Sequence, residues 1–70
     1  MKMEQLELWI KTWEHPVYEF FGMINSKSQD YALDTLDPEV VWEAVVIRRL
    51  ENGLVEGVNY RDFTNKRRVR

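Results

Sequence analysis

The side chains that could carry out chemistry are few, and they lie far apart in this sequence. His15 is the single histidine and the chain contains no cysteine, so the sequence offers neither a disulfide framework nor a Cys/His metal site. Ser26 and Ser28 lie in a polar stretch that lacks the glycines of a nucleophile elbow. The carboxylates between residues 34 and 39 lack the glycine of a calcium-binding loop. We therefore predict that the protein is not an enzyme and needs no metal or cofactor.

What remains for function is a binding surface, and the charge is distributed unevenly along the chain. Residues 1–46 carry three lysines against nine acidic residues, a net charge of −6. Residues 47–70 carry seven basic against three acidic residues, a net charge of +4. Such halves attract each other or direct different partners to two sides of the molecule.

Length and composition point to one small domain built from strands. A chain of 70 residues buries only about 60% of the surface that it exposes when unfolded. Its nine aromatic residues and many β-branched residues must supply the core, and both favour strands. The N-terminus has no signal-peptide pattern, and no stretch reaches the roughly 18 apolar residues that a membrane span needs. We expect a cytoplasmic protein without a membrane segment.

The clearest structural signal is a β-hairpin over residues 42–65. Two apolar runs flank Asn52-Gly53, a dipeptide typical of a two-residue turn in which both residues have positive φ. This turn predicts that Val45 lies opposite Tyr60 and that Arg49 lies opposite Glu56. The competing interpretation is a helix over residues 38–52, which the many β-branched residues of this stretch disfavour.

The rest of the chain suggests a helix followed by a second hairpin. Apolar residues from Met3 to Trp13 recur at spacings of three and four, which predicts a helix within residues 1–15. The same stretch also alternates from Leu6 to Ile10, so a strand competes. Residues 17–24 are rich in aromatic and β-branched residues and residues 30–36 follow an alternating pattern, so the two segments are expected to pair, with polar turn residues between them. A helix over residues 17–24 is the alternative, which Gly22 within it disfavours. The predicted fold class is mainly β, a small barrel or sandwich of four or five short antiparallel strands in residues 17–70 with an N-terminal helix.

Two segments resemble the core of Tudor domains, namely WEAVV at 42–46 and VNYRDFTN at 58–65. The resemblance covers roughly residues 30–70 and implies an SH3-like barrel with an aromatic cage for a methylated lysine or arginine. Carried over by position, the cage would consist of Trp42, Tyr60 and Phe63. Asn65 would bond the polar head of the ligand, and Tyr31 is a weaker fourth wall. The first functional hypothesis is therefore a module that binds a peptide or protein partner.

A second resemblance is to the small DNA-binding excisionases of phages. It requires residues 38–52 to form a recognition helix, with a basic C-terminal wing behind it. Phosphates or base edges would be contacted by Arg48, Arg49, Lys66, Arg67, Arg68 and Arg70.

The third hypothesis is a small inhibitor or adaptor of the kind that phages encode. Leu6, Trp9 and Trp13 would then form an apolar stripe that covers a partner or a second copy of the chain.

Overall fold

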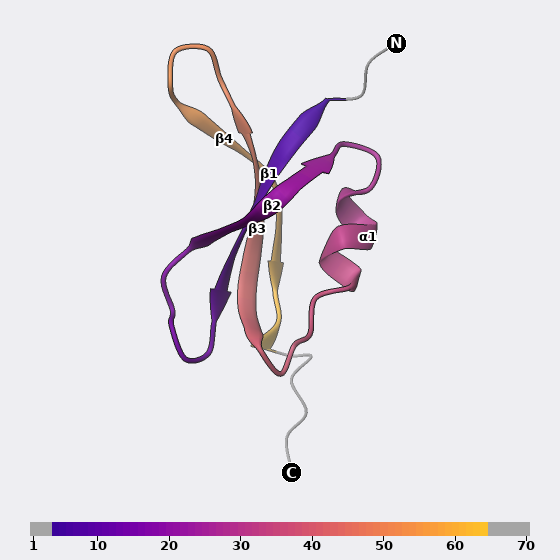
Figure 1. Ribbon diagram of the computed structural model, residues 1–70, viewed down its shortest axis with the longest axis vertical. Coiled ribbons are helices and arrows are strands. Elements are labelled where there is room, and N and C mark those ends of the chain that lie inside the picture. The colour runs from indigo at the N-terminus through magenta and orange to yellow at the C-terminus, as the bar shows by residue number, and fades with distance from the viewer. Residues whose placement is uncertain (1–3, 65–70) are drawn as a thin grey trace.

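The computed structural model describes residues 4–64, which form one antiparallel sheet and one short helix (Figure 1). The strands lie in the order β2-β1-β3-β4, so β1 and β3 are central and β2 and β4 are the edges. The prediction of a small, mainly β domain with four or five antiparallel strands is confirmed. In chain order the elements are β1 (Gln5–Thr12), β2 (Glu19–Asn25), α1 (Gln29–Asp34), β3 (Val41–Arg49) and β4 (Val55–Asp62).

The predicted N-terminal helix is wrong, because Gln5–Thr12 forms the central strand β1. A central strand carries apolar side chains on both sides, so residues at helical spacing and residues at alternating spacing are both apolar. Leu6 and Leu8 are each 1% exposed and lie in the core, whereas Trp9, the next residue after Leu8, points to the opposite face. Pairing with two neighbouring strands then decides in favour of the extended conformation.

The central hairpin is confirmed, but its turn has a different geometry. Gly53 has φ of 88° and is the one residue among 4–64 with positive φ. Its N–H donates to the carbonyl of Leu50, and the Leu50 N–H donates to the carbonyl of Leu54, so the loop has three residues rather than two. Asn52 keeps negative φ, and its side-chain oxygen accepts a hydrogen bond from the Leu54 N–H at 3.1 Å.

The longer loop shifts the register near the turn by one residue. Glu56 lies opposite Arg48 rather than opposite Arg49 as predicted. An irregularity between Val46 and Ile47 then restores the expected register, so Val45 does lie opposite Tyr60. The strand over Val41–Arg49 also excludes the competing helix over residues 38–52.

The segment expected to pair with β2 is instead the helix α1, and β2 pairs with β1. Leu33 and Leu36 are three residues apart and are 0% and 7% exposed. A helix or helical turn brings side chains at this spacing to one side, whereas a strand would point them to opposite faces. Burial of both leucines against the sheet therefore outweighs the alternating pattern of residues 30–36.

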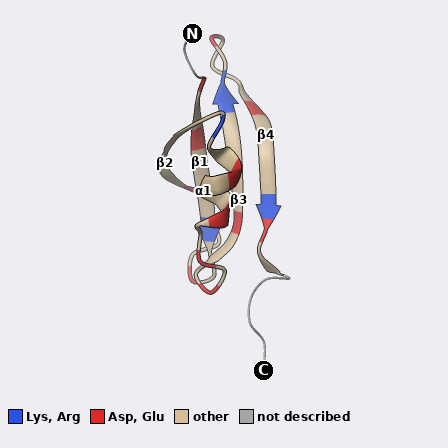
Figure 2. Cartoon of the chain, turned by 90° about the vertical axis from the view of Figure 1, so that its right-hand side faces the viewer, with Lys and Arg blue, Asp and Glu red and all other residues tan. Residues whose placement is uncertain are grey.

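The helix covers one face of the sheet, and Figure 2 shows it in front of β1 and β3. The core lies between them and contains no buried polar side chain among the described residues. No helix within residues 4–64 has the length and apolar character to cross a membrane. The core residues are Leu6, Leu8, Leu33, Leu36, Val41, Ala44, Val46 and Phe63.

Candidate binding surface on the open face of the sheet

A row of apolar side chains crosses all four strands on the face opposite α1. In the pairing registers Phe20 lies beside Trp9, Trp9 beside Val45, and Val45 beside Tyr60. Directly opposed residues in a sheet point to the same face, so this row forms a continuous apolar strip. Phe20 and Tyr60 at its two ends are 52% and 55% exposed.

Two ring pairs give this surface its shape. The Trp9 and Phe20 rings meet edge to face at 5.5 Å, and Trp13 stacks on Trp42 at 6.0 Å. Trp42 reaches this face because the register shifts between Lys11 and Thr12, which leaves Trp42 as an extra residue in β3. We call the six rings on this side the aromatic face, comprising Trp9, Trp13, Tyr18, Phe20, Trp42 and Tyr60.

A lysine and a glutamate lie among these rings. Lys11 Nζ is 3.5 Å from a carboxylate oxygen of Glu43, 4.6 Å from the Tyr18 ring centre and 5.2 Å from the Trp42 ring centre. The Tyr18 hydroxyl donates a hydrogen bond of 2.6 Å to Glu43. The aromatic face thus holds a cation of its own over two ring faces, with a carboxylate to balance it.

Burial and the Glu43 carboxylate change the acidity of the neighbouring phenols. Partial burial and the bond to Glu43 raise the pKa of Tyr18 well above its ordinary value, since ionisation would place a second anion beside the carboxylate. Desolvation and the same carboxylate raise the pKa of Tyr60. Both hydroxyls therefore remain protonated to a higher pH than an ordinary phenol does.

The second carboxylate on this face, that of Glu7, is also paired with a cation. Glu7 accepts hydrogen bonds from the Arg49 guanidinium at 2.7 and 2.8 Å and from the Trp9 indole N–H at 2.9 Å. These bonds lower the pKa of Glu7 to about 2, with Arg49 as the larger cause. Glu7 and Glu43 are thus each paired with a cation, and the aromatic face carries little net charge at its centre.

The structure does not bring the predicted cage together. Trp42 and Tyr60 lie on the aromatic face, but Phe63 is 2% exposed and packs in the core on the α1 side. A ring in the core cannot wall an open cage for a ligand. Tyr31 is 73% exposed on α1, away from the aromatic face, and Asn65 lies outside the described residues.

The residues proposed for nucleic-acid binding are placed differently from expectation. Arg48 forms ion pairs with Glu4 and Glu56, and Arg49 is paired with Glu7. Both arginines lie at the end of a strand and not on the recognition helix that the excisionase resemblance required. The remaining basic candidates, Lys66, Arg67, Arg68 and Arg70, lie outside the described residues.

The predicted partner stripe is split between the two faces of the sheet. Leu6 is a core residue with 1% exposure, so it is not available to a partner. Trp9 and Trp13 are partly exposed on the aromatic face. Sequence reasoning missed Lys11 and Tyr18, although the alternation of Trp9, Lys11 and Trp13 was a signal that these residues share one face of a strand.

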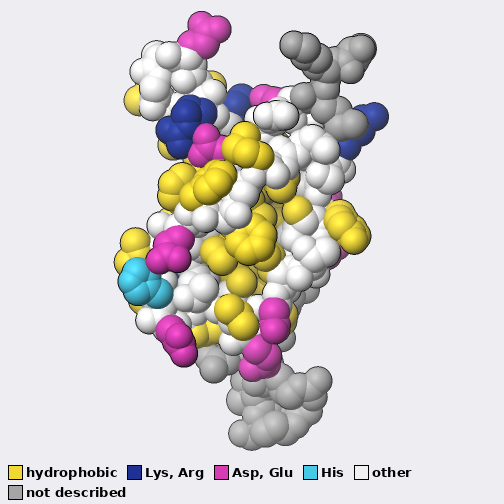
Figure 3. Space-filling model, viewed as in Figure 1, with side chains coloured by type: hydrophobic (Ala, Val, Ile, Leu, Met, Phe, Trp, Pro, Cys, Tyr) yellow, Lys and Arg dark blue, Asp and Glu magenta, His cyan; other side chains and the backbone are white. Residues whose placement is uncertain are grey.

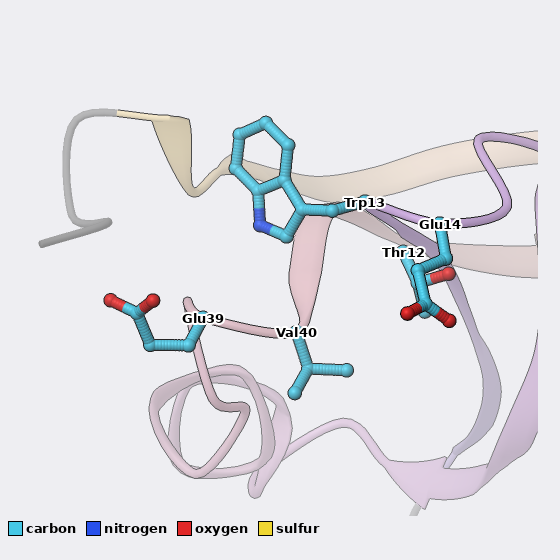
Figure 4. A pocket seen from close by; sticks show the side chains of 5 residues that line it. All are labelled: Thr12, Trp13, Glu14, Glu39 and Val40. Atoms are coloured by element: carbon cyan, nitrogen blue, oxygen red, sulfur yellow. The ribbon is translucent and has the colours of Figure 1, made fainter. Parts of the chain in front are cut away.

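A pocket of about 270 Å³ extends the aromatic face beyond the end of β1. Figure 4 shows the Trp13 indole and the Val40 side chain on two sides of it, with the carboxylates of Glu14 and Glu39 apart from each other. The Trp13 indole N–H donates to the Pro38 carbonyl at 3.0 Å, which fixes the ring. Among residues 4–64, no group of three or more His, Cys, Asp or Glu side chains could hold a metal ion.

The Tudor-like and excisionase-like resemblances of the sequence remain predictions. Comparison of the chain with protein families, with curated proteins and with solved structures found no match.

Proposed function

We propose that this protein is a non-enzymatic binding module that recognises a peptide or protein partner through the aromatic face. The observation that carries the proposal is the row from Phe20 through Trp9 and Val45 to Tyr60. It crosses the whole sheet, and no described element covers it. Aromatic side chains gathered on one exposed surface are typical of interaction sites.

The rings are held in place before any partner arrives. Trp9 is fixed by its bond to Glu7 and its contact with Phe20. Trp13 is fixed by the Pro38 carbonyl and by stacking on Trp42. Side chains that are already ordered lose less conformational entropy on binding, which favours their use as anchors.

The position of Lys11 indicates the kind of partner. Lys11 Nζ already occupies the space over the Tyr18 and Trp42 rings where a ligand cation would otherwise gain its attraction to the ring faces. The exposed ends of the row at Phe20 and Tyr60 have no such occupant in the described chain. We therefore expect the partner to contribute apolar or aromatic side chains to these ends rather than a methylated cation.

A peptide selection tests this proposal. Peptides from a displayed random library would be selected on the immobilised protein, and calorimetry would measure their affinities for the wild type, for two variants of the row and for one control variant. Phe20→Ala and Tyr60→Ala each remove an exposed ring from the row and are expected to weaken binding by about tenfold or more, as hot-spot residues do. Tyr31→Ala removes an even more exposed ring from α1 and is the matched control.

The outcome of that comparison decides the proposal. Unchanged affinity in Tyr31→Ala together with weaker binding in both row variants supports recognition through the aromatic face. Peptides that lose affinity only in Tyr31→Ala, or a library from which no peptide is enriched, would contradict it.

A further inference from the structure

The ammonium group of Lys11 is held among aromatic rings. On the side of the molecule shown in Figure 3, Lys and Arg side chains lie toward one end, whereas hydrophobic side chains gather across its middle. The side chain of Lys11 departs from this separation, because it is only 23% exposed and its charge lies beside the Tyr18 and Trp42 rings. Taking a charge out of water is costly unless the surroundings compensate it.

Three side chains compensate the charge of Lys11. The Tyr18 and Trp42 ring centres lie 4.6 Å and 5.2 Å from Lys11 Nζ, within the range of cation–π attraction. Glu43 places a carboxylate oxygen 3.5 Å from the same nitrogen, and its side chain is only 15% exposed. The set favours a cation over an uncharged group of the same size, because an uncharged group would leave the Glu43 carboxylate without its counter-charge.

These three side chains are ordered by contacts in which Lys11 takes no part. The Tyr18 hydroxyl donates a hydrogen bond of 2.6 Å to Glu43. Trp42 stacks on Trp13 with the ring centres 6.0 Å apart. Removal of the Lys11 side chain should therefore leave two rings and a carboxylate in place around an open space.

We propose that Tyr18, Trp42 and Glu43 form a binding site for an alkylammonium ion, and that Lys11 fills this site and closes it to the ammonium groups of other molecules. Lys11 thus determines specificity at the centre of the aromatic face. This role deepens the proposed recognition of a partner and rests on it, since Lys11 excludes a lysine or methylated lysine of the partner from that centre. The binding site itself does not depend on which partner is recognised.

Its attachment to the sheet makes Lys11 a strong competitor for the site. Lys11 lies opposite Glu43 in the pairing of β1 with β3, so its ammonium group reaches the carboxylate without any loss of translational freedom. A free ammonium ion loses that freedom on binding. The wild type should therefore bind free alkylammonium ions weakly, and a variant without the Lys11 side chain should bind them more tightly.

Titration with n-propylammonium tests the site, because Lys11→Ala removes three methylene groups and an ammonium group, which this ion replaces. The indole N–H signal of Trp42 in the NMR spectrum reports binding. We expect Lys11→Ala to bind the ion about tenfold more tightly than the wild type, or better. Lys27→Ala is the matched control, because it removes the same atoms from an exposed lysine in the turn after β2 and should bind like the wild type.

Two further titrations test whether the site recognises charge. 1-Propanol has nearly the size of n-propylammonium and no charge, so Lys11→Ala should bind it much more weakly. Adding Glu43→Gln to Lys11→Ala removes the carboxylate at almost constant size and should abolish the binding of n-propylammonium. Circular dichroism confirms that each variant is folded.

The wild type offers a test that needs no variant. Protons that lie over the face of an aromatic ring are shielded by its ring current. The ε-methylene proton signals of Lys11 should therefore lie upfield of those of Lys27 in the NMR spectrum. This measurement decides whether Lys11 fills the site even where Lys11→Ala does not fold.

Four results would overturn the inference. They are a folded Lys11→Ala variant that binds n-propylammonium no better than the wild type, equal binding of 1-propanol by that variant, a double variant that still binds the ion, and ε-methylene signals of Lys11 that match those of Lys27. None of these results depends on the peptide selection. Failure of Phe20→Ala and Tyr60→Ala to weaken peptide binding would contradict the proposed function and leave the ammonium site standing.

Discussion

The two faces of the sheet differ in the kind of side chain that they carry and in what covers it. On the face under α1, Leu6, Leu8 and Val46 are at most 1% exposed and no buried polar side chain is present among the described residues. On the opposite face the exposed ends of the row, Phe20 and Tyr60, remain about half accessible. Apart from Phe63, the covered face uses aliphatic residues that pack closely, whereas the open face uses aromatic rings that are partly exposed.

The difference shows how a short chain divides its apolar residues between stability and binding. A sheet needs only one covered face for a core. On the open face, side-chain contacts such as those of Lys11 with Glu43 and Trp42 hold the surface in shape without a covering element. We infer that substitutions under α1 act mainly on folding, and that substitutions on the aromatic face act mainly on binding.

The largest effect is expected from Phe63→Ala, on the covered face. The side chain is 2% exposed in the core, and its removal should cost about 3–5 kcal/mol. This is comparable with the whole free energy of unfolding of a chain of this size, about 4–10 kcal/mol, so the variant should be largely unfolded by circular dichroism. Tyr60→Ala in the same hairpin is the control and should stay folded; equal destabilisation by both would remove the distinction between the faces.

Trp42→Ala should destabilise the fold less than Phe63→Ala does, and its main effect should be on the affinity for a peptide. The indole is partly exposed and contributes the stacked pair with Trp13, which is worth about 0.5–1.5 kcal/mol beyond its burial. Chemical denaturation should show a loss of about 1–2 kcal/mol, while affinity for a selected peptide falls strongly. A variant that unfolds like Phe63→Ala would mean that Trp42 belongs to the core.

Glu43→Gln tests the charged centre of the aromatic face. It removes the partner of Lys11 and should destabilise the fold by about 1 kcal/mol. It should also lower the pKa of Tyr18 toward its ordinary value of 10.0. In the wild type that pKa is raised by folding, so the contribution of Tyr18 to stability is present below pH 10 and is lost as the pH rises further. Absorbance titration of tyrosinate in both proteins measures the shift; identical titration curves would contradict the contact.

The smallest effect is expected from Arg49→Gln, at the rim of the face. The variant loses the hydrogen bonds from the Arg49 guanidinium, which are the largest cause of the lowered pKa of Glu7, while the bond from Trp9 remains. The pKa of Glu7 should therefore rise from about 2 part of the way toward 4.5. Because the pKa is lowered by folding, the contribution of Glu7 to stability is present above pH 4.5 and is lost as the pH falls toward 2. Carbon-13 NMR of the Glu7 carboxyl measures this change, with Arg48→Gln as the control that should leave it unaltered.

The sequence predicted the central hairpin more accurately than the secondary structure of the segments that precede it. Asn52-Gly53 and the β-branched residues on either side are local signals, and the structure has a hairpin there. A two-residue loop requires positive φ at both Asn52 and Gly53, whereas in the structure Gly53 alone takes positive φ and the loop has three residues. Neither residue type alone determines that choice.

The two errors in secondary structure have one physical cause. Residues 1–15 fit both a helical and an alternating pattern, and residues 30–36 were assigned from an alternating pattern alone; in both segments tertiary contacts decided the conformation. Residues 5–12 became a strand because they pair on both sides, and α1 formed because Leu33 and Leu36 are buried together. The placement of Phe63 in the core follows from the same packing, which is why a cage inferred from position alone did not assemble.

The measurement that tests the central claim most directly is a two-dimensional amide NMR titration with a selected peptide. All three tryptophans of the chain, Trp9, Trp13 and Trp42, belong to the aromatic face, so their indole N–H signals report on it directly. We predict that the indole signals of Trp9 and Trp42 shift on binding while the backbone signals of α1 stay in place. Shifts confined to α1, with all three indole signals unmoved, would contradict recognition through the aromatic face.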